Sequence, residues 1–398
     1  MRIIVQKFGG TSVSTREKRN MVIDKVIYAI DQGYSPVVVV SAMGRKGDPY
    51  ATDSLLSLIN NKACSVEERE GDLLMCCGEI ISAVVMAEAF AERGYKTRVL
   101  TGGSAGIITD DNFGNAGVID VKAEKVLRVL KQGLIPIVTG FQGMTEEGDY
   151  TTLGRGGSDV TGALLGKALK AEYVEIYTDV DGIMTADPNI VANAKTIDRI
   201  DYKEVLQLAD QGAKVIHPRA VEYAFEGNIP LIVKNTFSNA PGTVITNLVE
   251  YEDSLFTGIT SMTNKTMVIV NLSDTCRNIG NDIFNLLARR KIKIELISEF
   301  QGQKVFTVDS DAAAEVEDTL KQLCTEYRII NNCSKVFLIG NTVSGMPEAM
   351  SKLVETLECN NVNVLQVSNS HTAIWCLIGE DDNKKALNEL HSAFFCAI

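Results

Sequence analysis

A lysine and two adjacent glycines stand where the first apolar run of the chain ends, in the segment "VQKFGGTSVSTREK". Lys7 closes a predicted strand, and Gly9 and Gly10 let a ligand approach the backbone closely. Backbone N–H groups in such turns bind phosphate oxygens, and Lys7 would add a positive charge. Ser14 and Glu17 have the spacing of a capping box that opens the next helix. A tight turn with a solvated lysine would explain the glycines equally well, so this segment alone leaves phosphate binding open.

A second glycine-rich segment, "TTLGRGGSDVTGALLGKAL", places Arg155 among glycines and shortly before Ser158 and Asp159. The planar guanidinium of an arginine matches the two oxygens of a carboxylate. Asp159 could orient Lys7 or face a metal-bound phosphate. A surface turn with a helix cap explains the glycines and the Ser-Asp pair, but it gives no reason for an arginine between glycines. We therefore predict an anion-binding loop here.

A third segment, "YTDVDGIMTADPN", contains Asp179, Asp181 and Asp187 just after a predicted strand. It lacks the ligand spacing and the final Glu of an EF-hand calcium loop. A strand-end loop that touches a nucleotide fits better, with Thr178 and Asp179 near the base and ribose. Some of these acidic residues are expected only to form turns.

The composition limits the classes of partner. The formal net charge is −12, so the overall field repels nucleic acids and anionic membranes, and an anionic substrate needs a local cationic site. Hydrophobic residues make up 45% and charged residues 23%, as in soluble globular proteins. The apolar runs are short and no signal-peptide pattern opens the chain, so we expect a cytoplasmic protein.

Cysteine and histidine usage argues against a dedicated metal site. The 9 cysteines are scattered without a CxxC pair, which is typical of reduced thiols in a cytosolic protein, and only 3 histidines occur. We therefore predict no protein-built zinc or other metal centre.

Six short apolar runs alternate with helical patterns up to about residue 245. This alternation predicts a mostly parallel sheet with helices on both faces, in a domain over residues 1–245. Ligands in such sheets bind beyond the carboxyl ends of the strands, where the three segments above lie. The predicted strands are "RIIVQKF", "PVVVVSA", "TRVLTG", "LIPIVTGF", "EYVEIYTD" and "IPLIVKN".

After residue 260 the order strand, helix, strand, strand, helix appears twice. "IKIELIS" at 292–298 and "VNVLQVS" at 362–368 occupy equivalent positions in the two repeats. We predict two ferredoxin-like βαββαβ domains over 260–332 and 333–398, which resemble ACT domains. Duplication favours a regulatory role over a merely structural extension.

Six motifs together resemble those of the aspartokinases, members of the amino acid kinase family that end in ACT domains. They are "KFGGTSV", "VSAMG", "CGE", "GRGGSD", "TDVDGIMTADP" and "GAKVIHPRA", in that order. "SAMGRKGDPYATDSLL" and "SNSHTAIWCLI" are most similar to the diaminopimelate-sensitive aspartokinases of Bacillus-type bacteria.

The resemblance implies roles for individual residues. Lys7 and Asp159 would be catalytic, Glu79 would bind the α-ammonium of aspartate, and Arg155 would bind its α-carboxylate. The implied ATP contacts are Lys7, Phe8, Gly9, Gly10, Ser41, Thr178, Asp179, Met184 and Lys214. The implied aspartate contacts are Thr52, Glu79, Arg155, Gly156 and Ser158. Asn189 stands where many relatives have an arginine, and it cannot supply that charge.

The implied reaction transfers the γ-phosphoryl group of ATP, with Mg²⁺, to the β-carboxylate of L-aspartate. A carboxylate is ionised at neutral pH and needs no strong base, so catalysis depends on alignment and charge neutralisation. This agrees with the absence of histidine from the glycine-rich motifs, and we expect His217 to be structural.

The ACT repeats imply feedback inhibition by diaminopimelate, lysine or threonine and a homodimer formed through these domains. Ser298 and Glu299 could meet the ammonium group of the effector, or they could form a sheet-edge turn. Rival functions are another kinase of the same fold, acting on acetylglutamate, glutamate or a nucleoside monophosphate, and a non-catalytic amino-acid sensor.

Overall fold

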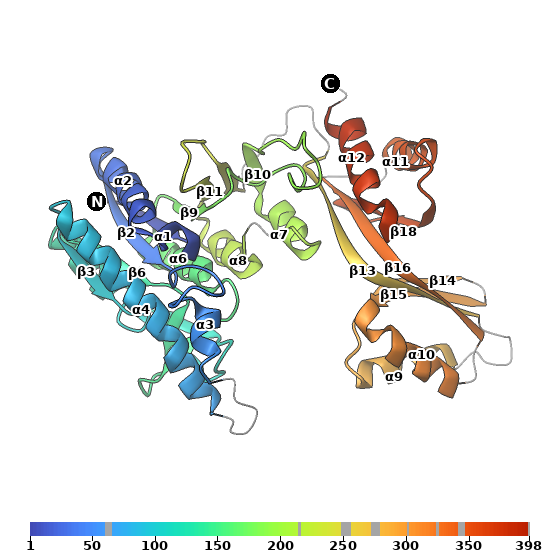
Figure 1. Ribbon diagram of the computed structural model, residues 1–398, viewed down its shortest axis with the longest axis horizontal. Helices are drawn as coiled ribbons and strands as arrows, with labels where there is room; N and C mark the ends of the chain where they lie inside the picture. The colour runs from blue at the N-terminus through green and yellow to red at the C-terminus, as the bar shows by residue number, and fades with distance from the viewer. Residues whose placement is uncertain are drawn as a thin grey trace. The chain divides into compact units, whose positions relative to one another are not determined.

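The computed structural model describes residues 1–59, 66–213, 216–247, 256–271, 279–300, 302–323, 326–340 and 347–396. The chain folds into two compact units (Figure 1). The N-terminal unit comprises the described parts of 1–184, 196–210 and 214–251. The C-terminal unit comprises the described parts of 185–195, 211–213 and 252–398.

An eight-stranded sheet forms the centre of the N-terminal unit, in the order β10-β12-β11-β9-β1-β2-β6-β3. All six apolar runs predicted as strands lie in this sheet, and every pairing except β11–β12 is parallel. The predicted mostly parallel sheet is therefore confirmed. The strands are β1 (Arg2–Phe8), β2 (Tyr34–Val40), β3 (Thr97–Leu100), β6 (Ile135–Thr139), β9 (Val174–Thr178), β10 (Arg199–Asp201), β11 (Leu231–Asn235) and β12 (Thr243–Thr246).

Helices cover both faces of this sheet. On one face α2 (Arg16–Asp31) and α4 (Glu68–Glu92) bury Val22, Ile23 and Met86 against strand residues such as Val38. On the other face α6 (Gly157–Leu169) packs on β1 and β9, and α8 (Pro218–Gly227) packs on α6. The small residues of α6 allow a close approach to the sheet, because a side chain at Gly166 would overlap Val174.

A second sheet of four short strands, in the order β5-β4-β7-β8, extends the N-terminal unit. Its strands are β4 (Ile107–Thr109), β5 (Val118–Val121), β7 (Gln142–Met144) and β8 (Tyr150–Thr152). The other helices of this unit are α1 (Gly10–Val13), α3 (Thr52–Leu56), α5 (Glu124–Lys131) and α7 (Tyr202–Asp210). The strand β8 leads directly into the Arg155 loop.

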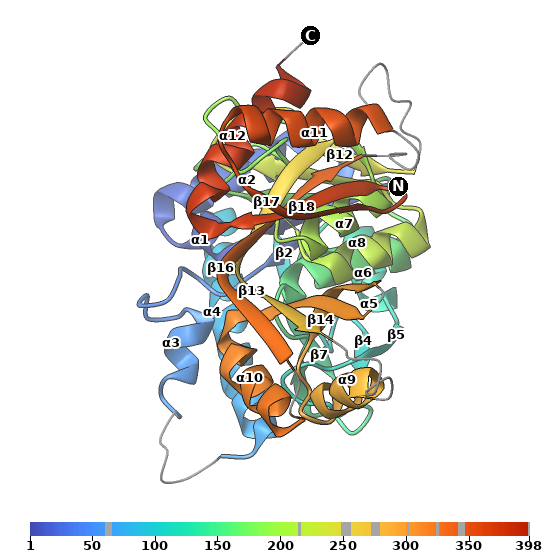
Figure 2. The same cartoon turned by 90° about the vertical axis from the view of Figure 1, so that its right-hand side faces the viewer.

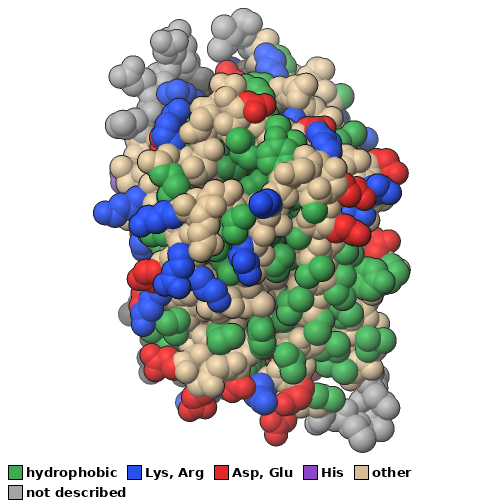
Figure 3. Space-filling model, turned by 90° about the vertical axis from the view of Figure 1, so that its left-hand side faces the viewer, with side chains coloured by type: hydrophobic (Ala, Val, Ile, Leu, Met, Phe, Trp, Pro, Cys, Tyr) green, Lys and Arg blue, Asp and Glu red, His purple; other side chains and the backbone are tan. Residues whose placement is uncertain are grey.

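Among the described residues, α4 is the helix whose length and composition alone would allow it to cross a membrane. In this fold it is a core helix, since Asp72 and Glu79 are buried and it packs against β3, β6 and β8. Its outer side exposes Leu73 and Val84. Figure 3 views the side on which β3 and α4 lie in Figure 1, and hydrophobic side chains gather on much of it.

The C-terminal unit contains an antiparallel sheet in the order β14-β15-β13-β16-β18-β17. Its helices α9 and α10 lie at one end and α11 and α12 at the other (Figures 1 and 2). Both predicted repeats thus supply strands and helices in the expected order. The elements are β13 (Gly258–Asn271), α9 (Ile279–Arg289), β14 (Ile294–Phe300), β15 (Gln303–Asp309), α10 (Ala313–Gln322), β16 (Glu326–Ile339), α11 (Pro347–Cys359), β17 (Val364–Asn369), β18 (Ala373–Gly379) and α12 (Asn383–Phe395).

Two long strands hold the repeats together. The far half of β13, 265–271, pairs with β15, while its first residues, 258–262, pair with the end of β16. The same end of β16 pairs with β18. The first strand of the first repeat, β13, therefore also pairs with the first strand of the second repeat, β16, at the centre of the sheet.

Residues 185–195 pack in the core of the C-terminal unit, although the sequence on both sides of them belongs to the N-terminal unit. Ala186 and Val191 are buried in one cluster with Phe256 and Leu353. The chain therefore enters the C-terminal core within the aspartate-rich segment that the sequence singled out.

Candidate active site

The phosphate-binding turn predicted after β1 is built by close backbone contacts. Gly44 N donates a hydrogen bond to Gly10 O at 3.0 Å. A Cβ atom at Gly10 would lie 2.5 Å from Ala42 O and 2.7 Å from Gly44 O, so no side chain fits there. Phe8 is wholly buried and stacks on Tyr177 with ring centroids 4.6 Å apart, which leaves only its backbone for a ligand.

The predicted capping box is wrong by one residue. Thr15, not Ser14, is the N-cap of α2, and its side chain accepts a hydrogen bond from Lys18 N at 3.3 Å. Ser14 ends α1 instead, and its hydroxyl donates to Thr11 O. The four-residue helix α1 moves the start of α2 by one position, and the sequence pattern did not show this helix.

Lys7 and Asp159 form a largely buried ion pair, with Lys7 Nζ 2.6 Å from Asp159 Oδ1. Lys7 lies at the carboxyl end of β1, and Asp159 lies in the first turn of α6. The N-terminus of α6 carries a partial positive charge that adds to the lysine. Lys7 and Asp159 are about 150 positions apart in the sequence, and in the structure they are neighbours beside the glycine turn.

Hydrogen bonds join the residues next to this ion pair to a buried carboxylate. Ser41 Oγ donates to Ser158 Oγ at 2.9 Å, and Ala42 N donates to Glu79 Oε1 at 3.1 Å. Ser158 directly precedes Asp159, and Ser41 follows the last residue of β2. The ends of β1 and β2, the start of α6 and the middle of α4 therefore meet at one place.

Glu79 is only 2% exposed, and its Oε2 atom has no hydrogen-bond partner among the described residues. Burial raises the pKa of this carboxyl to about 8, and hydrogen bonds from the Ala42 backbone and Gln142 oppose the shift only in part. A cation bound next to Glu79 would restore its charge. Thr52 begins α3, which packs against α4 near Gly78, so it lies on the same side of the site.

The Arg155 loop is shaped by its neighbouring glycines. Gly156 has φ +70°, and a side chain there would overlap the His217 ring. His217 is the N-cap of α8, and burial lowers its pKa. Arg155 itself is exposed and makes no hydrogen bond or ion pair within the part of the chain that the structure describes. Its guanidinium is therefore available to a ligand.

The residues predicted near the nucleotide follow β9. Thr178 Oγ1 accepts from Val180 N at 3.1 Å and so holds the start of the loop. Asp179 forms an ion pair with Arg45, which the sequence analysis missed. Arg45 lies just after the "VSAMG" motif, and its position there was the available signal.

The other residues that the sequence placed near the nucleotide lie in different parts of the structure. Met184 is half-buried and forms an isolated β-bridge with Thr196. Asn189 donates to Asp187 Oδ1 within its own loop, in the C-terminal unit. Lys214 lies outside the described residues.

The effector residues proposed from the sequence lie on β14. Ser298 Oγ accepts from Gln366 Nε2 at 2.8 Å, so the two repeats touch at this position. Gln366 Oε1 is buried and has no partner among the described residues. Glu299 forms an ion pair with Lys304 at 3.0 Å. Gln366, on β17, was not singled out by the sequence.

Family models identify the class of the protein. The amino acid kinase family model matches residues 2–235, more than half of the chain, and an ACT domain model matches 336–394. With the Lys7–Asp159 pair at the glycine turn, these matches define an amino acid kinase with a C-terminal ACT region.

Individual relatives narrow this class. The chain is 42% identical to aspartokinase 1 of Bacillus subtilis over 400 residues, which covers 99% of both chains. It is 38% identical to the aspartokinase of Geobacillus stearothermophilus, covering 99% of this chain and 97% of the relative. The structure of Escherichia coli aspartokinase III in complex with aspartate and ADP has a TM-score of 0.77 at 27% identity, over 99% of this chain and 100% of that chain. The chain belongs to the aspartokinases.

This membership makes the protein an ATP-dependent kinase and confirms the resemblance drawn from the six motifs, including the similarity to Bacillus enzymes. It also decides against the rival kinases of the same fold and against a non-catalytic sensor.

Proposed function

We propose that the chain transfers the γ-phosphoryl group of ATP to the β-carboxylate of L-aspartate, giving 4-phospho-L-aspartate, at the ends of β1, β2 and β9. One observation supports the assignment of this reaction to particular residues. A buried lysine–aspartate pair lies beside the glycine turn, and the segments that carry it are tied to the buried Glu79 by two hydrogen bonds, Ser41 to Ser158 and Ala42 N to Glu79. A cation for phosphate and an anion for an ammonium group are thus built into one site.

In this mechanism the protein aligns two anions that repel each other. Lys7, the backbone of the glycine turn and the N-terminus of α6 bind the phosphates and stabilise the charge of the transferred group. Arg155 binds the α-carboxylate of aspartate and Glu79 binds its α-ammonium group, which leaves the β-carboxylate free to attack. Since that carboxylate is already ionised, no general base is required.

The donor set also fits a nucleotide-bound Mg²⁺. Among the residues the structure describes, no group of three or more acidic, cysteine or histidine side chains forms a metal site. Mg²⁺ in kinases is held mainly by phosphates with one or two carboxylates. Asp159, beside the phosphate turn, would share the ion with ATP. Once bound, the ion would neutralise charge on the phosphoryl oxygens.

Regulation belongs to the same proposal. A feedback amino acid would bind beside Ser298 and Glu299, where Gln366 Oε1, which has no partner among the described residues, offers an acceptor for its ammonium group. Escherichia coli aspartokinase III has been solved in complex with lysine and aspartate in a T-state. For this chain diaminopimelate is the first candidate, then lysine and threonine. We continue to predict a homodimer that forms through the ACT domains, with domain bounds of 260–332 and 333–398. A cytoplasmic location also stays a prediction.

The test is an acyl-hydroxamate assay with aspartate, glutamate and acetylglutamate as acceptors. Lys7→Ala should lower turnover with aspartate by about 10³-fold or more, because it removes the charge that stabilises the transition state. Arg155→Ala should raise the KM for aspartate and leave the KM for ATP largely unchanged. Lys125→Ala, at an exposed position on α5, is the matched control. Near-native turnover of Lys7→Ala, or equal weakening of both substrates by Arg155→Ala, would refute the assignments.

Point variants suit the effector test better than deletion of the residues after 260. Such a deletion would strip the core around Ala186 and Val191 and disturb the chain next to the nucleotide loop. Ser298→Ala and Gln366→Ala should weaken inhibition by the true effector and keep the uninhibited rate. Inhibition that is unchanged in both variants would place the effector elsewhere.

A further inference from the structure

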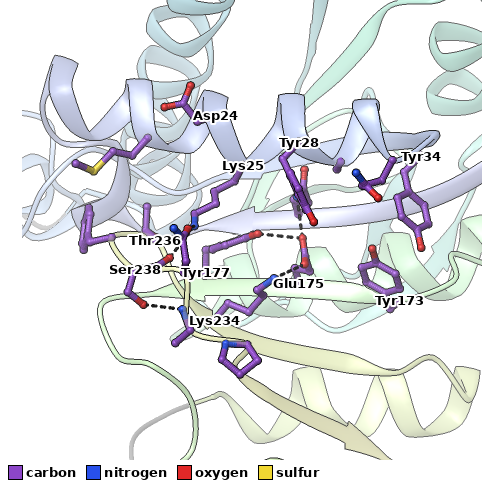
Figure 4. A pocket seen from close by; sticks show the side chains of 18 residues that line it. Asp24, Lys25, Tyr28, Tyr34, Tyr173, Glu175, Tyr177, Lys234, Thr236 and Ser238 are labelled. Carbon is purple, nitrogen blue, oxygen red and sulfur yellow. Dashed lines mark hydrogen bonds and ion pairs between the residues drawn. The ribbon is translucent and has the colours of Figure 1, made fainter.

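A cavity of about 620 Å³ lies in the N-terminal unit, away from the ion pair of Lys7 and Asp159. Side chains alternate along a strand, so Gln6 points to the opposite face of the sheet from Lys7. Gln6, Glu175 and Lys234, on β1, β9 and β11, line this cavity. Figure 4 shows Glu175 and Lys234 below α2, which covers the cavity from above. The cavity is therefore separate from the proposed active site.

One end of the cavity is cationic. Lys25 Nζ donates to Ser238 O at 2.7 Å and to Asn239 Oδ1 at 2.9 Å, and both of these partners are uncharged. Lys234 Nζ lies 3.2 Å from Glu175 Oε1. Burial lowers the pKa of Lys25, and the charge of Lys234 lowers it further. The ammonium group of Lys234 thus pairs with the buried Glu175, whereas the hydrogen-bond partners of Lys25 are uncharged.

The two carboxylates among the described lining residues, Glu175 and Asp24, offset this charge only in part. Glu175 is already fully used, because Gln6 Nε2 donates to its Oε2 at 2.8 Å, as does Tyr177 OH at 3.2 Å. Asp24 also lines the cavity, but it is exposed and pairs with Arg93 at 2.7 Å. An anion bound between the two lysines would relieve their repulsion.

The other end of the cavity is aromatic. Tyr34 and Tyr173 meet edge to face with ring centroids 5.5 Å apart, and Figure 4 shows them at the end away from Lys25. Tyr28 comes from α2 and is 65% exposed, so its ring is free to cover a ligand. Arg2 covers one face of the Tyr34 ring at 4.1 Å from its centroid, and the remaining aromatic surface favours a flat ring. In the wall between the two ends, Gln6 Oε1 is buried and has no partner among the described residues, so it would accept a hydrogen bond from a ligand.

We propose that this cavity binds a small molecule with a planar ring and an anionic group, as a second site on the kinase unit. The anionic group lies between Lys25 and Lys234, and the ring packs against Tyr28, Tyr34 and Tyr173. An aromatic carboxylate and a nucleoside monophosphate share this chemistry.

The cavity is connected to the loop after β9. Thr236, which also lines it, donates its N–H to Thr178 O at 2.9 Å and shares a hydrogen bond with Ser12 at 2.7 Å. Ser238 and Asn235 both donate to Asp181. A ligand that fixes this segment would change the KM for ATP more than the KM for aspartate.

Isothermal titration of the full-length protein with L-phenylalanine, 4-hydroxybenzoate and uridine 5′-monophosphate tests the proposal. We expect saturable binding of at least one probe that ATP and aspartate do not displace. The response to the three probes distinguishes a carboxylate ligand from a phosphate ligand. Binding should weaken at least about 10-fold, or 1.4 kcal/mol, in Lys25→Met and in Tyr28→Ala. It should not change in Lys125→Met.

Aspartokinase turnover without the probes should be unchanged in Lys25→Met and Tyr28→Ala, which separates this test from that of the proposed function. Tyr28→Ala removes an exposed side chain and leaves the core intact, so it covers the case in which Lys25→Met fails to fold. Three outcomes would each overturn the proposal. They are no saturable binding of any probe at millimolar concentration, binding that both variants retain, and displacement by ATP.

Discussion

The charge state of Glu79 should control how aspartate binding depends on pH. The carboxyl is buried beside the proposed position of the α-ammonium group, and its pKa is raised to about 8 in the free protein. Only the ionised form can pair with an ammonium group. The ionised fraction falls from roughly three quarters at about pH 8.5 to roughly 3% at about pH 6.5, so the KM for aspartate should rise about 25-fold over that range.

Steady-state rates at saturating ATP, measured across this range, give the KM profile. Glu79→Gln removes the titrating group and keeps the shape of the side chain, so its KM should be high and nearly independent of pH. Calorimetry in buffers of different ionisation enthalpy adds an independent measure. Near pH 7 aspartate binding should release about 0.9 proton from the wild type and almost none from the variant.

Stability gives a second consequence of the same group. A carboxyl whose pKa is higher in the folded than in the unfolded state makes the protein less stable as the pH rises from about 4.5 through about 8. The loss is on the order of 5 kcal/mol, from about 3.5 pKa units at about 1.4 kcal/mol each. Glu79→Gln should therefore unfold at higher denaturant concentration than the wild type at about pH 9, and at a similar concentration at about pH 4. A flat KM profile in the wild type, or the same profile in Glu79→Gln, would refute this reasoning.

Three further predictions concern the parts that hold the site and the C-terminal unit together. Asp72→Ala leaves the N–H groups of Gly114 and Thr152 without their acceptor. It should lower the free energy of unfolding, measured by chemical denaturation, by about 3 kcal/mol or more. A loss below about 1 kcal/mol would contradict the role of Asp72 in holding β8 in place. Gly156→Ala should lower kcat/KM for aspartate at least about 10-fold. Gly133→Ala is its control, because Gly133 has nearly the same φ but no atom within 4 Å of the added Cβ. This control should change stability by only about 1 kcal/mol and leave the kinetics intact. Glu295 is partly buried, which would raise its pKa, but Lys293, Lys335 and Lys265 hold the pKa at about 2. Glu295→Gln should therefore cost about 2 kcal/mol at neutral pH and almost nothing near pH 2, the difference disappearing as the pH falls from about 4.5 through about 2. Equal denaturation midpoints at neutral pH would refute the last prediction.

Some features of the molecule follow from the sequence because their causes are local. The six apolar runs predict the strands of the central sheet, since a strand buried on both faces needs continuous apolar residues. The glycine segments after β1 and before α6 mark the ends of strands and the starts of helices, where a backbone can bind anions. The motif around Lys7 and the motif around Asp159 could be recognised separately, and the parallel sheet explains why they meet.

Other features were decided only by the tertiary structure, because they depend on distant parts of the chain. The sequence cannot show that Glu79 is buried and that no basic side chain of the described residues pairs with it, and this burial sets its pKa. The ion pair of Arg45 with Asp179 forms because the fold brings the loops after β2 and β9 together. Packing likewise decides three other features. They are the start of α2 after Thr15, the sharing of strand β13 between the repeats, and the insertion of residues 185–195 into the C-terminal core. Local pattern determined which groups the site contains, and packing between distant segments determined their charge, their partners and their connection to the C-terminal unit.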